Sequence, residues 1–116
     1  MFNVEKKRLV DAGRHDLAAK VKWIAKDLGD GLGFDIASFT SDAQDILIEV
    51  KTTKGAAHLP FYVSDAELRM SEKAKGSYRL YRVFDFNGKP RVFELVGPLR
   101  SKLALTATTF RAVVAT

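Results

Sequence analysis

The chain has 116 residues, contains no cysteine and only two histidines, and carries a formal net charge of +5. A length of this order suits one domain around a single hydrophobic core, and the lack of cysteine excludes a disulfide-stabilised scaffold and argues against zinc or thiol chemistry. The lack of cysteine also fits a reducing cytoplasm, which is the expected location. No apolar run is long enough to cross a membrane and no signal-peptide pattern is present, so no membrane partner is expected.

The excess of basic residues favours a polyanionic partner, and nucleic acid is the commonest such partner of a basic domain. Charge alone does not decide the partner, because 14 acidic residues are interspersed with 19 basic ones. The longest basic run, Lys6–Arg8, is also what a solvated helix face carries. Nucleic acid, DNA before RNA, is therefore the partner that we expect.

The first elements in chain order are predicted from periodicity. Residues Phe2–Ala12 are predicted to form a helix that ends at Gly13. Residues Lys20–Ala25 alternate as a strand does, whereas the spacing of apolar residues allows a helix over Asp16–Leu28 instead. Trp23 is interpreted as a core residue, with stacking on a nucleic-acid base as the alternative.

Three glycines, at positions 29, 31 and 33, lead into a predicted strand at Phe34–Phe39. Asp30 lies between two of these glycines and is interpreted as a turn residue, with a metal contact as the alternative. A polar connection of hairpin length separates this strand from a second one at Ile46–Thr53. The two strands are therefore expected to pair.

The second strand carries an acidic and a basic residue two positions apart, the most informative pattern of the sequence. Because side chains alternate along a strand, Glu49 and Lys51 share one face, while Ile48 and Val50 share the other and can enter a core. Asp35 lies at the start of the preceding strand. If the strands pair near Asp35, two carboxylates and one ammonium group meet at one edge of the sheet.

This grouping suits metal-assisted hydrolysis of a phosphodiester. Mg²⁺, or Mn²⁺ in its place, takes oxygen ligands and usually keeps several waters, so Asp35, Glu49 and the backbone carbonyl of Val50 can supply the protein ligands. The ion would lower the pKa of a bound water and neutralise charge on the scissile phosphate. Lys51 could orient or deprotonate that water, or stabilise the charged transition state. The alternative is that opposite charges decorate the solvent face of a strand.

A helix is predicted to begin after Ser64 and to end at Gly76. Ser64 and Glu67 have the spacing of a capping box, so Glu67 is interpreted as a cap rather than a catalytic acid. Basic residues around an acidic site would offset its repulsion of phosphate. The candidates for contacts with nucleic acid are Lys54, Arg69, Lys73, Arg79 and Arg82.

The remaining elements are predicted to be strands. Tyr78–Phe86 has apolar residues on both faces, as expected for a central strand covered on both sides. An Asn-Gly turn then leads into a further strand at Arg91–Val96. Leu103–Val114 is rich in threonine and is expected to be a last edge strand or a loosely docked tail.

Four segments, standing in order, resemble a known family. They are Gly29–Phe39, Ile48–Gly55, Pro60–Leu68 and Tyr78–Phe86. Together they resemble the NO VEIN C-terminal domain family, which is related to the PD-(D/E)xK restriction-endonuclease-like superfamily, and the likeness runs from about Glu5 to Leu99. The expected fold is α/β: a restriction-endonuclease-like core with a central mixed β-sheet of about five or six strands flanked by helices. We expect a single PD-(D/E)xK nuclease-like domain over residues 1–116.

The resemblance also places Asp35, Glu49 and Lys51 at the catalytic positions. PD-(D/E)xK enzymes often carry a further Glu on the first helix, and Glu5 is the candidate for that metal ligand, although we favour a solvent-facing residue there. Members usually have more helix before this point, which suggests a domain excised from a larger protein. Members resemble modules attached to helicases, ATPases and restriction or phage-defence systems.

Two functions are compatible with these patterns. The first is a Mg²⁺- or Mn²⁺-dependent endonuclease that cuts DNA, less readily RNA, in restriction or phage defence, either as a homodimer or attached to a helicase or ATPase. The second is a non-catalytic module of the same fold that binds nucleic acid or a protein inside a larger assembly. In a third, purely structural interpretation, Asp35 and Glu49 are replaceable without consequence.

Overall fold

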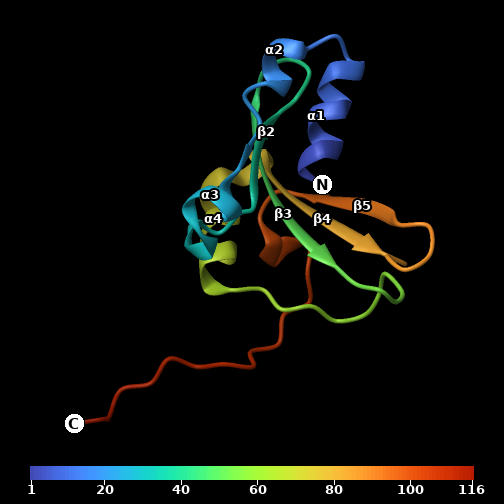
Figure 1. The fold of residues 1–116 in the computed structure, drawn as a ribbon. Helices are drawn as coiled ribbons and strands as arrows, with labels where there is room; N and C mark the ends of the chain where they lie inside the picture. The colour runs from blue at the N-terminus through green and yellow to red at the C-terminus, as the bar shows by residue number, and fades with distance from the viewer.

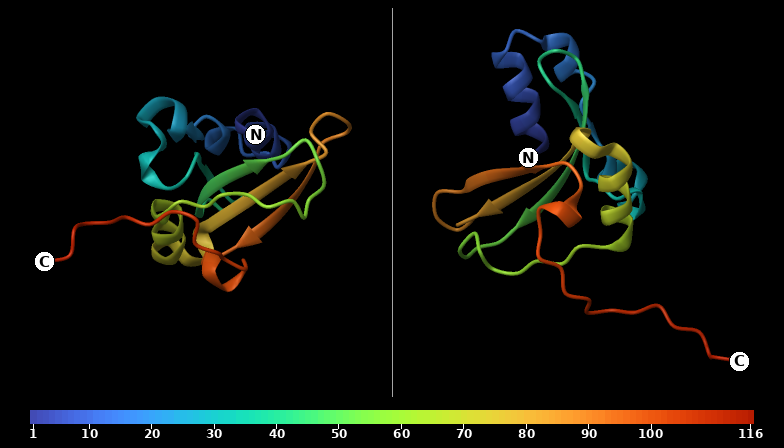
Figure 2. Two further views of the ribbon diagram at one scale, coloured as in Figure 1. Left: turned by 90° about the horizontal axis from the view of Figure 1, so that it is seen from below. Right: turned by 180° about the vertical axis from the view of Figure 1, so that it is seen from behind.

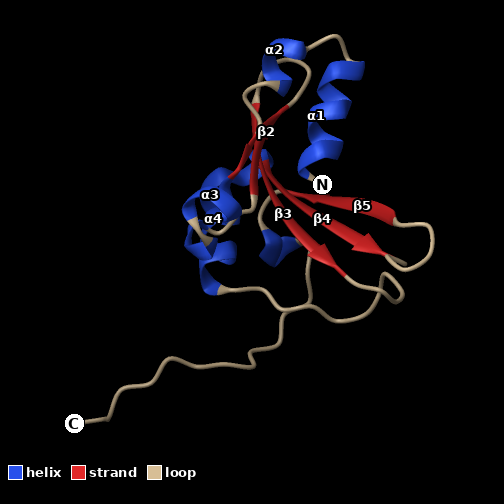
Figure 3. Ribbon diagram, viewed as in Figure 1, coloured by secondary structure: helices blue, strands red, loops and turns tan.

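Five strands form one mixed sheet in the order β1-β2-β3-β4-β5 (Figures 1 and 3). The computed structural model describes all 116 residues except the side chain of Asp30, so the prediction for that side chain lies outside the described residues. Strands β3 and β4 are parallel, and the other neighbours are antiparallel. The strands are β1 (Lys22–Trp23), β2 (Ile36–Phe39), β3 (Asp45–Thr52), β4 (Tyr78–Phe84) and β5 (Arg91–Val96).

Four α-helices and three short 3-10 turns accompany the sheet, so the predicted α/β class with a central mixed sheet and flanking helices is confirmed. The helices are α1 (Phe2–Asp11), α2 (His15–Ala18), α3 (Ile24–Leu28) and α4 (Asp65–Ala74), and the 3-10 turns are Asp30–Leu32, Lys75–Ser77 and Leu99–Ser101. None of the helices in the described part of the chain has the length and apolar character that a membrane span requires.

Helix α4 lies in the crossover between the parallel strands β3 and β4, which need a long connection to run in the same direction. Its start is fixed by the predicted capping box, which the structure confirms. The Ser64 Oγ accepts a hydrogen bond from the Glu67 N–H (3.1 Å), and the Ser64 N–H donates to Glu67 Oε1 (2.9 Å). The helix therefore begins where its own first turn satisfies the free N–H groups.

Helices cover both faces of the sheet, as the view from below shows (Figure 2, left). On the α1 face, the strand residues Ile36, Ile46 and Ile48 pack against Leu9 and Leu17 of α1 and α2. On the opposite face, the α4 face, a second buried cluster centres on three residues and packs against α4 and the last 3-10 turn. Its members are Tyr78, Leu80 and Leu99.

The predicted strand at Lys20–Ala25 is confirmed in part, as the two-residue strand β1, and the alternative of one helix over Asp16–Leu28 is wrong because β1 separates α2 from α3. The prediction that Trp23 is a core residue is wrong: as part of edge strand β1 it remains 42% exposed.

Residues 104–116, all within the described part of the chain, form no helix or strand, so the tail alternative holds and the edge-strand alternative does not. This tail leaves the body of the protein (Figure 1).

Candidate active site

Asp35 lies where β2 separates from β3. Its N–H donates to the carbonyl of Ile48 (2.8 Å), and its Oδ2 accepts from the N–H of Val50 (2.8 Å). The carboxylate thus takes the place of a main-chain acceptor at the first position beyond the strand pairing, which runs to the pair Ile36 and Ile48. The predicted pairing of the two strands near Asp35 is confirmed, and it holds this carboxylate against β3.

The carbonyl of Val50 lies on the same side of β3 as Asp35. In a strand, the N–H and the C=O of one residue point toward the same neighbouring strand. Because the N–H of Val50 reaches the Asp35 carboxylate, its carbonyl oxygen lies on that side too. One carboxylate and one main-chain oxygen are therefore neighbours at an open edge of the sheet.

Glu49 and Lys51 both lie on the α4 face, as strand alternation predicts. The Nζ atom of Lys51 is 3.5 Å from Oε1 of Glu49. It also donates to both carboxylate oxygens of Glu67, at 3.0 and 3.1 Å. Glu49 is only 5% exposed. The ammonium group is thus held between two carboxyl groups in a largely buried site.

Glu67 belongs to the site, although the sequence interpretation treated it as a cap only. The structure gives it both roles, since Oε1 accepts from the Ser64 N–H and from the Lys51 ammonium. The capping-box pattern already accounts for a glutamate at position 67, so the neighbouring sequence gives no sign that its side chain also contacts Lys51. The signal that could have found it is topological: a right-handed crossover lays the first turn of α4 on the sheet face that carries Lys51.

The pKa values of the two carboxyl groups, Glu49 and Glu67, are shifted in opposite directions. Burial raises the pKa of Glu49 well above its ordinary value, and its hydrogen bond to Glu67 and the nearby Asp35 charge add to this, while Lys51 opposes it. Burial also acts to raise the pKa of Glu67, but hydrogen bonds from Glu49, the Ser64 N–H and Lys51 outweigh it, and the net shift is downward. Glu49 therefore carries the proton and donates it to the Glu67 carboxylate.

Tyr78 is fully buried and holds the loop before β2. Its hydroxyl donates to the carbonyl of Gly33 at 2.8 Å. Burial raises the pKa of this hydroxyl, and the charges of Glu49, Glu67 and Asp35 raise it further, so it stays protonated. Gly33 itself has a φ of +85°, and a Cβ atom there would lie 2.5 Å from the Ala66 carbonyl oxygen of α4. The close approach of this loop to α4 requires glycine.

A cavity of about 410 Å³ opens beside this edge of the sheet. Asp35 and Val50 form part of its wall, and Trp23 together with Phe2, from the start of α1, forms another part. The carboxylate of Asp35 therefore borders both β3 and an open cavity. Glu49 and Lys51 are not part of its wall, so the cavity adjoins the site at Asp35 and Val50 only.

The donor set fits a hard divalent cation. In the described part of the chain, no group of three or more His, Cys, Asp or Glu side chains is arranged to hold a metal ion. Mg²⁺ needs fewer, because it usually binds one or two carboxylates and keeps several waters. The carboxylate of Asp35, the carboxyl group of Glu49 and the carbonyl of Val50 are all oxygen donors, and an ion that binds Glu49 must displace its proton.

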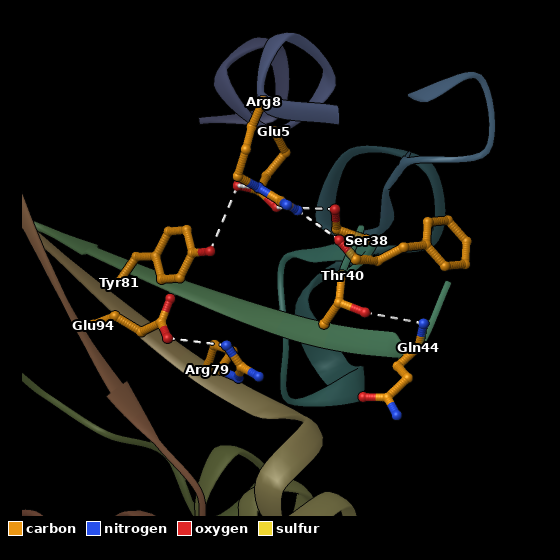
Figure 4. A network of polar contacts seen from close by, with 9 residues as sticks. Glu5, Arg8, Ser38, Thr40, Gln44, Arg79, Tyr81 and Glu94 are labelled. Atoms are coloured by element: carbon orange, nitrogen blue, oxygen red, sulfur yellow. Dashed lines mark hydrogen bonds and ion pairs between the residues drawn. The ribbon is translucent and has the colours of Figure 1, made fainter. Parts of the chain in front are cut away.

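Glu5 lies on the α1 face, where its carboxylate points toward Arg8, Ser38 and Tyr81 (Figure 4). Its carboxylate accepts from Arg8 (2.9 Å) and Ser38 Oγ (2.9 Å), and the Tyr81 hydroxyl is 3.5 Å away. Tyr81 stands opposite Val50 in the sheet, and both therefore point away from the face of Glu49. The prediction of a solvent-facing Glu5 is also wrong, because the residue is 1% exposed and its partners keep it buried.

The predicted nucleic-acid contacts fall into separate places. Arg82 is only 1% exposed and donates to the carbonyls of Lys51 and Leu59, so its prediction as a phosphate contact is wrong. Arg79 lies on the α1 face, where it pairs with Glu94 at 2.9 Å. Arg82 is the register partner of Lys51 in β4 and lies beside it, whereas Arg79 lies on the opposite face of the sheet.

Three of the predicted basic residues are exposed. Arg69 and Lys73 lie one turn apart on α4 and line a second cavity, of about 300 Å³. Arg69 also pairs with Asp65 at 2.9 Å. Lys54 stands in the loop that follows β3. These three remain candidates for contacts with phosphate.

Comparison with known proteins gives one finding. Residues 1–95 match the family described as Protein NO VEIN, C-terminal. Comparisons with curated proteins and with solved structures give no match.

Proposed function

The chain belongs to the NO VEIN C-terminal family, and from this membership and the geometry of the site we propose that it is a metal-dependent nuclease domain of the PD-(D/E)xK class. The observation that carries the proposal is the placement of Lys51 within 3.5 Å of Glu49, beside the Asp35 carboxylate and the Val50 backbone. Carboxylates and one ammonium group at the edge of a sheet are what hydrolysis of a phosphodiester requires.

Asp35, Glu49 and the carbonyl of Val50 would hold a Mg²⁺ or Mn²⁺ ion. When bound, the ion supplies a Lewis acid for the scissile phosphate and an acidified water. Asp35 is already positioned for this by its hydrogen bond from the Val50 N–H. Glu49 contributes its carboxylate after it gives up its proton.

Lys51 would act directly on the reacting atoms. Its ammonium group can orient the attacking water and stabilise the negative charge that develops on the phosphate. Glu67 is a positioning residue, because its two hydrogen bonds hold the ammonium group in place. The side chain of Lys51 is half-buried and hydrogen-bonded to both oxygens of Glu67, so little reorganisation is needed when charge develops.

DNA is the proposed substrate, ahead of RNA, and the net charge of +5 supports a nucleic acid in general. The resemblance to modules of restriction and phage-defence systems supports a cytoplasmic role there, as a homodimer or attached to a helicase or ATPase. These assignments go beyond the site and are part of the proposal.

A non-catalytic binding module is the second candidate. The observation that favours it is that Lys51 is already neutralised by Glu67, at 3.0 Å, in a site whose Glu49 holds a proton. An ion pair of this kind, between Lys51 and Glu67, could serve only to hold α4 against β3. This module would bind nucleic acid in a salt-sensitive manner without metal-dependent turnover.

Cleavage of a substrate panel separates the two candidates. The panel contains supercoiled plasmid, linear duplex, single-stranded DNA and structured RNA, each incubated with Mg²⁺, with Mn²⁺ and with EDTA. The nuclease predicts cleavage that EDTA abolishes and that Glu49→Gln lacks. Salt-sensitive binding, with no cleavage by the wild type under any of these conditions, would favour the binding module instead.

A further inference from the structure

Two aromatic side chains from different elements stack at the surface of the protein. Phe2 of α1 and Trp23 of β1 have ring centroids 5.8 Å apart and an interplanar angle of 27°. Trp23 remains 42% exposed in this arrangement. An exposed indole held rigid by a stacked partner offers a flat apolar surface that a planar ligand can cover.

Two lysines flank this aromatic pair. The Nζ atom of Lys6 lies 5.0 Å from the centroid of the Phe2 ring, and that of Lys26 lies 5.4 Å from the centroid of the Trp23 ring. Neither lysine belongs to any of the ion pairs found among the described residues. Each ammonium lies over one ring of the pair, and because neither is held by a carboxylate, both can move from the ring to an anionic ligand.

The stacked pair faces the same cavity as the candidate active site. Phe2 and Trp23 line the cavity of about 410 Å³ whose wall also contains Asp35 and Val50. The first turn of α1, which carries Phe2, lies beside the sheet in both the front and rear views (Figures 1 and 2). A ligand that stacks on Trp23 thus lies next to the carboxylate proposed to hold the metal ion.

We propose that Phe2, Trp23, Lys6 and Lys26 form a stacking platform for an unpaired base of a nucleic-acid strand. A base inside a duplex has both faces covered by its neighbours, so only an unstacked base can lie on the indole. The two lysines match the phosphates on either side of such a base. This proposal rests on the proposed function and deepens it, because it assigns single-stranded or locally unpaired nucleic acid as the preferred substrate.

Trp23 is the single tryptophan of the chain, so its fluorescence reports on this platform directly. The experiment is a titration of the intact chain, in EDTA, with a short oligothymidylate and with an abasic oligonucleotide of equal length and charge. Stacking predicts quenching by the oligothymidylate and an affinity for the abasic strand that is about 5- to 100-fold weaker. Equal affinities for both strands, or no quenching by either, would overturn the proposal.

Lys26→Gln tests the proposed contact between Lys26 and phosphate, and it leaves the Trp23 fluorescence available for the measurement. Loss of one phosphate contact should lower the slope of log K against log salt concentration by roughly 0.7. Lys89→Gln, in the exposed turn between β4 and β5, is the matched control and should leave the slope unchanged. Identical slopes for the two variants would contradict the assignment of Lys26.

The titration and the cleavage panel fail independently. Because EDTA is present, quenching needs no turnover, and base-dependent quenching without any cleavage would support the platform while it refutes the metal-dependent nuclease. Cleavage of DNA without base-dependent quenching would support the metal-dependent nuclease and refute only the stacking platform.

Discussion

Lys51 and Glu67 connect the strand of the candidate site to the helix that follows it. The ammonium group donates to both oxygens of a carboxylate that also accepts the N–H of Ser64, the N-cap of α4. The Glu67 side chain thus caps the N-terminus of α4 and also orients Lys51, the proposed catalytic group of β3. Capping and site geometry should be separable by mutation.

Glu67→Gln is expected to lower cleavage more than stability. Glutamine can still accept the Ser64 N–H, and so it keeps the capping box, but it removes the charge that holds Lys51. Ser64→Ala is the matched variant, which should cost about 0.5–2 kcal/mol of unfolding free energy and leave cleavage per folded molecule unchanged. Urea unfolding and cleavage rates of both variants make the comparison. Equal cleavage by Glu67→Gln and wild type would show that the ion pair is only structural.

The proton on Glu49 predicts how stability depends on pH when no metal is present. The ordinary pKa of this carboxyl is 4.5, and burial raises it in the folded protein. Between pH 4.5 and the raised pKa this carboxyl keeps its proton in the folded chain but loses it in the unfolded chain, so its contribution to the free energy of unfolding falls as the pH rises through that interval. Because glutamine does not titrate, the free energy of unfolding of the Glu49→Gln protein should fall less with rising pH than that of the wild type.

Urea unfolding in EDTA at a series of pH values measures this effect. Glu72→Gln, an exposed position on α4, is the control and should retain the wild-type dependence. A Glu49→Gln protein whose stability falls as steeply with pH as that of the wild type would show that Glu49 is charged in the folded state.

Gly33→Ala should destabilise the protein by more than about 1 kcal/mol, because an L-residue is strained at its positive φ and the new Cβ meets the α4 backbone. Gly13→Ala separates the two causes. Gly13 has a similar φ of +76°, but a Cβ there meets no atom within 4 Å. Thermal unfolding should therefore show a larger loss for Gly33→Ala than for Gly13→Ala, and equal losses would argue against the close contact with α4.

Replacement of Glu5 should affect stability and not cleavage. Its carboxylate satisfies Arg8 and the buried Ser38 hydroxyl on the α1 face. Glu5→Ala leaves these donors without their acceptor and should cost about 2–4 kcal/mol. Glu5→Gln keeps an acceptor and should unfold later than Glu5→Ala while it retains wild-type cleavage per folded molecule. Loss of metal-dependent cleavage in a folded Glu5→Gln protein would instead support Glu5 as a metal ligand.

The parts of the site that the sequence predicts are those set by strand geometry. Alternation places Glu49 and Lys51 on one face, and pairing of adjacent strands brings Asp35 to them. The missed parts depend on contacts between distant elements. The capping box accounts for Glu67 locally, whereas its contact with Lys51 follows from the crossover. Hydrophobicity suggests a buried Trp23, but β1 is an edge strand of two residues that cannot cover it.

Charged residues show the same limit. Glu5, expected to face solvent, and Arg82, expected to contact nucleic acid, are both buried, because each finds partners supplied by other elements. A charged side chain can be buried when such partners satisfy it, and the sequence does not show which partners the fold will provide. The capping box of α4 and the central strand β4, whose signals are local, were predicted correctly.

The central claim is that Lys51 acts on a phosphodiester, and the most direct measurement is the single-turnover cleavage rate of Lys51→Ala in Mn²⁺. Lys89→Ala is the control for loss of one positive charge, and circular dichroism verifies that both variants are folded. If Lys51 acts on the reacting atoms, Lys51→Ala should cleave about 100-fold or more slowly than the wild type, and Lys89→Ala should cleave at the wild-type rate. A folded Lys51→Ala protein that cleaves as fast as the wild type would contradict it.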